Sequence, residues 1–422
     1  MSASFLDLSV ARAMSDLRLT LEVAPARPSP PAAGAAPRLA CGSETTFSVV
    51  SERAAFDALE MEWNDLAARA EPAPSVFQSF NWHWHWCNHF LDPRPASRNR
   101  LHILLARRQG RLVLVWPLVV TRRHGLDVLR WMGEPVGQYG DVILDADARA
   151  TPLLEQAWRH LVQTAPADVI ALRKVRGDAA ADRVLARCCR VRTATERAPY
   201  VELAPGRARP DSQRHSAKAC KNRRRLRRRL ESAGGLGSVS VSASGEAGRL
   251  AALAVDMKRA WLADRGLYSK ALRDERFTRF LTDVATDTHR PTGCRVRALE
   301  LAGWPIALQV AFAAGTTEYV HLTVYSLAHE KSGAGVLLLE DGLRSAAAEG
   351  LYRVDLLAPA DDYKLGWADG CVRVDDWAHP ITLRGRIYAA GYLAIARGRL
   401  KAAARKLPRG LRRLCLHALR LT

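Results

Sequence analysis

The sequence predicts an α/β (α+β) protein of two lobes, each a mixed, largely antiparallel sheet flanked by helices. The chain has 422 residues, of which 48% are hydrophobic and 25% charged, a globular composition longer than one ordinary domain. Strand patterns follow one another in hairpin and meander order, with helical patterns between them. We expect a flexible leader at 1–43, an N-terminal half at 44–205, a C-terminal half at 206–380, and basic amphipathic helices at 381–422.

The first half begins with a short strand pattern at FSVV and a helical pattern at 52–69. Strand patterns at LHILLARR and RLVLVWPLVVTRR meet at a Gln109-Gly110 turn, which predicts a hairpin. The segment GEPVGQYGDVIL then predicts a glycine-containing loop and a strand. A helix at 151–164 and a strand at DVIALRKV complete this half.

An aromatic stretch, FQSFNWHWHWCNHF, lies between these elements. Trp82, Trp86 and Phe90 recur every four residues, so we expect the buried face of a helix. A strand or a sugar-stacking platform is the alternative, because the tryptophans also alternate. We expect no metal site, since beyond Cys87 no cysteine or carboxylate pattern supports one. The histidines that invite the metal interpretation are His83, His85 and His89.

The second half begins with a basic helix at 212–232 that ends at Gly234 and Gly235. A strand at SVSVSAS and helices at 246–264 and 272–288 follow. Three consecutive strand patterns, CRVRALEL, PIALQVAFAAG and TEYVHLTVYS, then predict a meander. After it come a glycine loop at KSGAG, a helix at VLLLEDGLRSAAAEG and a strand at LYRVDLLAP.

The net charge of +20 is concentrated in two segments. Residues 214–229 contain nine Arg or Lys and residues 378–422 contain eleven, and neither segment contains Asp or Glu. The remainder is neutral in sum. The two segments therefore indicate anionic partners at defined places: phosphates, lipid headgroups or nucleic acid.

The cellular setting that the sequence predicts is cytoplasmic. Eight cysteines occur without a CxxC pair or regular spacing, which argues against a zinc module or a disulfide scaffold. The first residues contain acidic side chains where a signal peptide needs an apolar core, and no run reaches about 18 apolar residues. A peripheral association with the inner face of a membrane is compatible with the basic segments.

The order of meander, glycine loop, helix and strand resembles the core of a GNAT (acetyltransferase) superfamily acyltransferase. In that family the loop before the helix holds the pyrophosphate of coenzyme A, because glycines and unpaired N–H groups at a helix start suit an anion. The family pattern has Arg or Gln where this chain has Glu330, so Lys331 could supply the charge instead. The residues that match this loop are Lys331, Ser332, Gly333, Ala334 and Gly335.

Several stretches taken together resemble the CelD-like branch of this superfamily, which is associated with bacterial polysaccharide synthesis. They are VFQSFNWHWHW, LVLVWPLVV, GQYGDVIL, the basic helix, GWPIALQVAF and DDYKLGW. The match covers residues 46–377 and depends on the order and spacing of these motifs. The resemblance implies two GNAT-like halves, of which the second retains the cofactor loop.

Acyl transfer needs a base for the acceptor proton, a donor to the tetrahedral oxyanion and often an acid for the leaving thiolate. Tyr325, at the end of the third meander strand, is the candidate acid; a packed aromatic is the alternative. Asp355 lies in an apolar strand, where a lone carboxylate is costly, so we expect it either to be ion-paired or to face the cleft. Lys364 could bind an anionic acceptor or the acyl carbonyl, unless it is a solvated surface lysine.

Six further residues are candidates for acceptor binding. Tyr139 and Asp141 lie beside glycines in a loop that could reach the cleft between the halves. Gln309 and His321 lie on adjacent meander strands and face either the cleft or only the sheet surface. The last two, in the loop beyond Asp355, are Asp362 and Tyr363.

The function that follows is acyl-CoA-dependent transfer, N- or O-acetylation of a sugar or polysaccharide precursor, with no metal. Only the resemblance to the CelD-like branch implies a role in polysaccharide synthesis. The alternatives are a Fem-like transferase that uses aminoacyl-tRNA and a non-catalytic GNAT scaffold that binds a membrane or a synthase complex.

Overall fold

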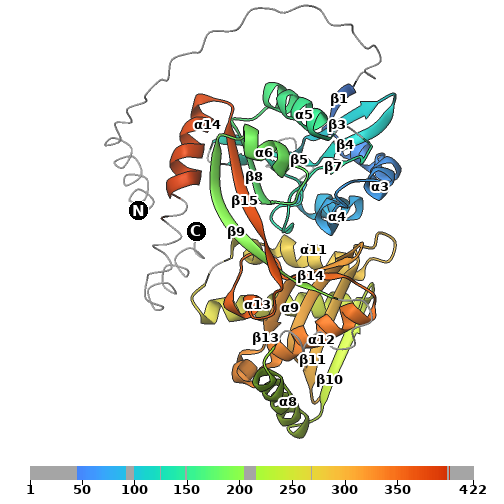
Figure 1. The fold of residues 1–422 in the computed structure, drawn as a ribbon, viewed down its shortest axis with the longest axis vertical. Coiled ribbons are helices and arrows are strands. Elements are labelled where there is room, and N and C mark those ends of the chain that lie inside the picture. The colour runs from blue at the N-terminus through green and yellow to red at the C-terminus, as the bar shows by residue number, and fades with distance from the viewer. Residues whose placement is uncertain are drawn as a thin grey trace, which may run out of the picture. The chain divides into compact units, whose positions relative to one another are not determined.

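The computed structural model describes residues 45–91, 99–123, 125–147, 150–203, 215–267, 269–396 and 399. The leader predicted at 1–43 and most of the segment predicted at 381–422 lie outside these residues. The described part forms two lobes that share one sheet, and the predicted fold class is confirmed (Figure 1).

The shared sheet contains eleven strands among the described residues, in the order β10-β11-β12-β13-β14-β9-β15-β8-β6-β5-β2. Two long strands, β9 (Val191–Glu202) and β15 (Gly370–Pro380), pair along their length and run from one lobe to the other (Figure 1). In the upper lobe β15 also pairs with β8, although β15 follows all the other strands in the chain. The lobes therefore exchange a strand.

The second lobe contains the predicted meander. Its antiparallel strands are β10 (Leu236–Val241), β11 (Cys294–Leu301), β12 (Trp304–Ala314) and β13 (Thr317–Tyr325), and the short β14 (Arg353–Asp355) pairs with β13 in parallel. Alternating patterns with turns at Ala302-Gly303 and Gly315 account for this arrangement, because all three residues have positive φ angles.

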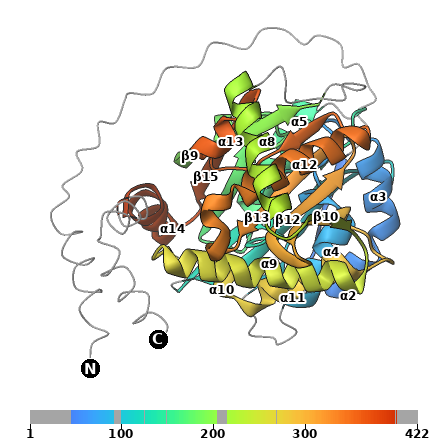
Figure 2. The ribbon, with the colours of Figure 1, turned by 90° about the horizontal axis from the view of Figure 1, so that it is seen from below.

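Helices cover both faces of this part of the sheet (Figure 2). On one face lie α9 (Gly245–Asp264) and α11 (Glu275–Thr286), with the short α10 (Lys270–Arg273) between them. On the other face lies α12 (Ala334–Ala348), over which α8 (Ala217–Ser232) packs. The remaining elements of this lobe are the short helices η2 (Leu327–Ser332) and α13 (Asp362–Leu365).

The basic helix α8 is less exposed than its composition predicts. Leu226 and Leu230 pack against α12 and the meander, and Arg223 is buried beside Glu340, to which its Nε donates at 2.9 Å. One face is therefore docked by two leucines and an ion pair, and only the opposite face is solvated.

The first lobe contributes β2 (Asn99–Leu101), β5 (Leu118–Arg123), β6 (Leu126–Trp131) and β8 (Val169–Arg176) to the shared sheet. A separate four-stranded sheet has the order β1 (Thr45–Val50), β3 (Ile103–Arg108), β4 (Arg111–Trp116) and β7 (Ile143–Leu144). The predicted hairpin is β3 and β4. Its second strand pattern is divided at Pro117, which has no N–H to donate, and β5 then joins the other sheet.

The helices of the first lobe are α2 (Arg53–Asp57), α3 (Glu60–Ala68), α4 (Phe80–Phe90), α5 (Ala150–Thr164) and α6 (Asp182–Cys188), with a 3-10 turn, η1 (Val76–Gln78). Beyond β15 the chain forms α14 (Leu383–Ile387) and a π-helical segment, η3 (Tyr388–Ala396). None of the helices in the described ranges is long and apolar enough to cross a bilayer.

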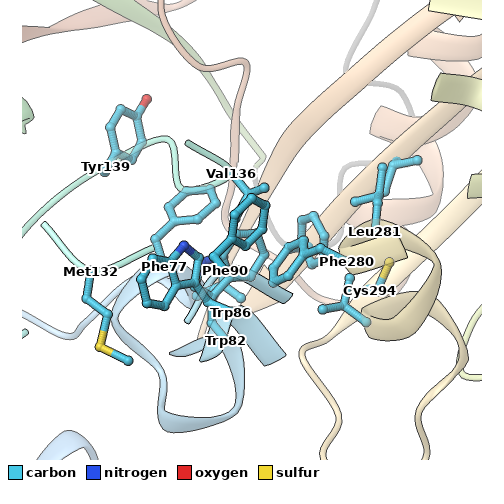
Figure 3. Close-up of a cluster of buried hydrophobic side chains, with 14 of the residues drawn as sticks. Phe77, Trp82, Trp86, Phe90, Met132, Val136, Tyr139, Phe280, Leu281 and Cys294 are labelled. Carbon is cyan, nitrogen blue, oxygen red and sulfur yellow. The ribbon is translucent and has the colours of Figure 1, made fainter. Parts of the chain in front are cut away.

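The aromatic stretch is the helix α4, and the prediction that it packs in the core is confirmed. Trp82, Trp86 and Phe90 are each at most 2% exposed. They meet Phe280 and Leu281 of the second lobe in one apolar cluster (Figure 3). The ring of Trp82 lies edge-on to Phe280 at 4.9 Å. The core is therefore continuous across the two lobes.

Candidate active site

The meander opens at the edge of β13. Strands β13 and β14 pair only from Thr317 to Tyr319, after which they diverge. The second half of β13 thus lacks a neighbouring strand on this side. Backbone N–H and carbonyl groups that no neighbouring strand pairs need other hydrogen-bond partners. Lys258 of α9 is such a partner, because its ammonium donates to the Thr323 carbonyl at 3.0 Å.

A cavity of about 320 Å³ occupies this opening. The unpaired part of β13, the start of α12 and the segment 356–364 form its walls, and α9, α10 and α11 close it from the other face. Pro135, Gln138 and Lys174 of the first lobe also line it. Its size is that of a small-molecule site. Both lobes therefore contribute to one pocket.

The predicted glycine loop lies at one wall of this cavity, which Gly335 lines. Gly333 is the N-cap of α12 with φ of 78°, and a Cβ there would meet Leu226 at 2.6 Å. A residue other than glycine would thus be strained in its backbone and would clash. Ser332 Oγ accepts from the Ala334 N–H at 3.2 Å. Among the described residues the N–H groups of Gly333 and Gly335 have no acceptor.

An arginine accompanies Glu330, the residue that departs from the family pattern. Arg265 contacts the Glu330 carboxylate, lies over the Trp261 ring at 4.0 Å, and donates to the Tyr325 hydroxyl at 3.4 Å. The carboxylate is therefore neutralised by a cation at the C-cap of α9. Lys331, the predicted substitute, is exposed.

Three lysines line the cavity, and burial lowers the pKa of each. The pKa is about 8 for Lys174 and for Lys258, and Lys364 shifts in the same direction. The ammonium of Lys364 donates to the carbonyls of Leu357 at 2.8 Å and Pro359 at 3.0 Å. It therefore fixes the segment after β14, and the alternative of a solvated lysine is wrong, because Lys364 is only 9% exposed.

His321 lies on the wall formed by β13. Its Nε2 donates to the Val136 carbonyl at 2.7 Å, and Nδ1 has no partner among the described residues. Burial lowers its pKa to about 4, so the imidazole is neutral at neutral pH. The bond to Val136 places the proton on Nε2 and leaves a lone pair on Nδ1.

The predicted residues only partly converge on the cavity. His321, Gly335, Tyr363 and Lys364 line it, and Asp361 lines it in place of Asp362. Tyr363 is 53% exposed, so it lies at the mouth. The ring of Tyr325 lies beside Gly335, where a Cβ would be 3.1 Å from it, but Tyr325 does not line the cavity.

Asp355, which the sequence left either ion-paired or facing the cleft, does not line the cavity. Its carboxylate is buried, accepts from the Tyr139 hydroxyl at 2.8 Å and forms an ion pair with Arg176. Of the two situations that the sequence left open, the structure has the ion pair.

Asp141 and Gln309 also do not line the cavity. Asp141 accepts from the N–H groups of Val142, Ala180 and Ala181, and burial raises its pKa to about 6. Gln309 lies fully buried under α12, where its Oε1 accepts from Arg297 at 3.1 Å. Both side chains hold the fold around the site.

Two lining residues gave no usable signal in the sequence. Lys174 lies near the end of a strand pattern and Lys258 belongs to a helix, so each resembles a surface lysine. Lys174 nevertheless has a φ of 56°, which is uncommon for a residue with a Cβ. Only the tertiary structure brings both lysines to one cavity.

Comparisons with known proteins agree with this fold. Residues 217–365 match the family model described as an acetyltransferase (GNAT) domain. The crystal structure of FemX is 10% identical, with coverage of 79% of this chain and 98% of that chain and a TM-score of 0.52. At this identity the likeness shows the fold. No curated protein matches the chain by sequence.

Two other solved structures are more distant in shape. A tandem GNAT protein from the clavulanic acid biosynthesis pathway is 16% identical, with coverage of 80% of this chain and 99% of that chain and a TM-score of 0.42. L-PGS from Bacillus licheniformis is 10% identical, with coverage of 80% and 96% and a TM-score of 0.47. The match of residues 217–365 to the model of an acetyltransferase (GNAT) domain supports an acyltransferase activity for the chain.

Proposed function

We propose that the chain transfers an acyl group from acyl-CoA to an amine or hydroxyl of a sugar or polysaccharide precursor. The observation that carries the proposal is the cavity where β13 and β14 diverge, with the glycine start of α12 in its wall. A donor bound there supplies a thioester carbonyl to the acceptor. The sugar acceptor and the polysaccharide process depend on the resemblance of the sequence motifs to the CelD-like branch.

The start of α12 fits a diphosphate. Two N–H groups, those of Gly333 and Gly335, have no acceptor among the described residues, and the positive end of a 15-residue helix dipole lies beside them. We assign the pyrophosphate of the donor to this loop, residues 331–335. Lys331 is exposed there and adds a cation that is not buried in the fold.

The acceptor side is the opposite wall of the cavity. Tyr363 at the mouth and His321 on β13 are the polar groups that we assign to acceptor binding, with Asp361 in the place predicted for Asp362. Lys364 acts by fixing the segment 356–364, because two carbonyls already accept from its ammonium. We keep Tyr325 as the candidate acid predicted from the sequence, because its ring lies beside Gly335 of the glycine loop, although it does not line the cavity.

Isothermal titration with acetyl-CoA tests the donor site. Replacing Gly335 by valine puts a branched side chain against Tyr325 at the cavity wall, and we expect the affinity to fall about tenfold or more. The matched control is Gly245→Val at the start of α9, where no atom lies within 4 Å of an added Cβ. It should bind acetyl-CoA as the wild type does. A folded Gly335→Val protein with unchanged affinity would contradict the assignment.

A second function remains because the chain shares its fold with FemX. A transferase that uses aminoacyl-tRNA would need a cationic surface to bind this polyanion, and the solvated face of α8 carries arginines. The same titration with charged tRNA separates the two. If the protein binds charged tRNA but not acetyl-CoA, aminoacyl transfer is favoured. If it binds neither ligand, a non-catalytic scaffold is favoured.

A further inference from the structure

A second cavity, of about 440 Å³, adjoins the first. It lies between the lobes: Gly133, Glu134 and Tyr139 come from the first lobe, and Lys270 and Arg276 come from the second. The two cavities share three lining residues, which are Pro135, Lys174 and Ala271. A ligand in the second cavity can therefore extend toward the proposed site of transfer.

Cations dominate the lining of this second cavity. Four of its arginines are neutralised by carboxylates. The pairs are Arg122 with Asp127, Arg130 with Glu134, Arg173 with Asp376, and Arg276 with Asp274. Three further cations line it, namely Arg123, Lys174 and Lys270. None of these three forms an ion pair within the described part of the chain, so the cavity carries a surplus of positive charge.

Lys174 lies at the junction of the two cavities in a fixed conformation. Its N–H donates to Asp376 at 2.9 Å and its carbonyl accepts from the Gly140 N–H at 3.2 Å. These bonds hold φ at 56°, and its ammonium contacts the side-chain oxygen of Gln138. Unfavourable backbone conformations of this kind persist where the surroundings enforce them, and they cluster at functional sites.

An unpaired donor also lines the second cavity. The indole N–H of Trp131 is buried, with the residue 3% exposed, and has no acceptor among the described residues. An indole N–H can only donate, and leaving it unpaired costs free energy. A Cβ at Gly140 would lie 2.2 Å from this nitrogen, so only glycine lets the loop approach the indole.

We propose that the second cavity binds the phosphate of a phosphorylated sugar, the acceptor of the transfer. The three cations without an ion-pair partner outweigh the charge of about −2 of a phosphate monoester, and Trp131 in the same wall has an indole N–H without an acceptor among the described residues. The volume exceeds that of a phosphate and leaves room for the sugar, which then lies toward Lys174 and the first cavity. This inference rests on the proposed acyltransferase function and names its acceptor class.

Calorimetric titration with glucose 1-phosphate, glucose and inorganic phosphate tests the proposal. We expect glucose 1-phosphate to bind more tightly than either of the other two probes. The double variant Arg123→Gln, Lys270→Gln should weaken its binding by about tenfold or more per charge removed, since hydrogen bonds to charged groups are worth about 1.5–3 kcal/mol. Both side chains are exposed, so the variant should fold. The matched control is Arg249→Gln, an exposed arginine on α9 outside both cavities.

Acetyl-CoA, titrated into the same proteins, separates the two proposals. The double variant should keep its affinity for acetyl-CoA within about twofold. Equal binding of glucose 1-phosphate by wild type and double variant, or no preference for it over glucose or inorganic phosphate, would overturn the second site and leave the donor site standing. Loss of acetyl-CoA affinity in the double variant would also overturn it, by assigning this cavity to the donor. If glucose 1-phosphate binds to the wild type and acetyl-CoA does not, the donor assignment is wrong instead.

Discussion

The hydroxyl of Tyr139 donates a hydrogen bond to Asp355 Oδ1 at 2.8 Å and so joins two residues that are 216 positions apart. Arg176 contacts the other oxygen of the same carboxylate, and its guanidinium lies 4.9 Å from the centre of the Tyr139 ring. Burial raises the pKa of Tyr139 well above its usual value, so the phenol stays protonated and donates. The three side chains hold the loop of the first lobe against β14 of the second.

Replacing Asp355 by asparagine should therefore lower stability. The change leaves the partly buried guanidinium of Arg176 with only the half-exposed Asp178 as an ionic partner, and breaking a fully buried ion pair costs about 3–5 kcal/mol. We expect a loss near 3 kcal/mol in urea unfolding. A stable Asp355→Asn protein that binds acetyl-CoA but has no activity would instead support the catalytic role predicted from the sequence.

The variant Tyr139→Phe removes the hydroxyl that donates to Asp355 and so measures its contribution to stability. It removes one hydrogen bond to a carboxylate, which is worth about 1.5–3 kcal/mol. In a double-mutant cycle with Asp355→Asn the two losses should be less than additive, because both changes remove the same bond. Additive losses would show that the hydroxyl and the carboxylate do not stabilise the fold together.

Lys258 should make stability rise with pH above neutrality. Burial and the neighbouring Lys364 lower its pKa in the folded state to about 8, against an ordinary value of 10.5. Between these two values the unfolded chain binds a proton that the folded chain does not, so the free energy of unfolding increases with pH. Between pH 7.5 and 9.5 the urea midpoint of the wild type should therefore rise relative to that of Lys258→Met. If the difference between the two midpoints stays constant over this range, the lowered pKa of Lys258 is wrong.

Asp283 links α4 to α11. Its Oδ2 lies 2.9 Å from Nδ1 of His85 and 3.0 Å from Nε2 of His89. Burial opposes ionisation of this carboxyl, but the bonds to the two histidines outweigh burial and hold its pKa below the usual value. A carboxyl whose pKa is lowered in the folded state stabilises the fold at pH values above its ordinary pKa. This contribution to stability is lost as the carboxyl becomes protonated in acid. The difference in the free energy of unfolding between wild type and Asp283→Asn should thus be largest near pH 7 and should decrease below about pH 5.

The local order of the second lobe could be predicted from the sequence because its signals are local. The turns at Gly303 and Gly315, the loop at Gly333 and the helix after it each follow from neighbouring residues. The same holds for the buried face of α4, where a four-residue spacing of aromatics suffices.

Long-range pairing could not be predicted. The segment VRVDDWAHP falls within the half predicted at 206–380, yet it forms β15, which returns to pair with β8 of the first lobe. No local pattern encodes which distant strand is its partner. The same limit applies to Lys174, which belongs to a first-lobe strand and lines a cavity with residues of the second lobe. It also applies to Asp355, whose ion-pair partner Arg176 belongs to that strand.

The solvated face of α8 should bind an anionic membrane surface without contributing to the fold. Arg224, Arg225, Arg228 and Arg229 are exposed, whereas Arg223 is buried against Glu340. Each cation near an anionic membrane contributes on the order of 1 kcal/mol. Replacing the four exposed arginines by glutamine should leave the free energy of unfolding within about 0.5 kcal/mol of the wild type.

Sedimentation with vesicles decides where such a surface is recognised. Wild type should pellet with anionic but not neutral vesicles and should lose this as salt rises. The fourfold glutamine variant of α8 should pellet less, and Arg223→Gln, the matched control, should lose stability instead, because it leaves Glu340 buried without its closest partner. Truncation after Pro380 tests the basic segment predicted at 381–422 in the same assay. If the truncated protein no longer pellets while the α8 variant does so fully, the membrane contact belongs to that segment, and the arginines of α8 must serve another anion.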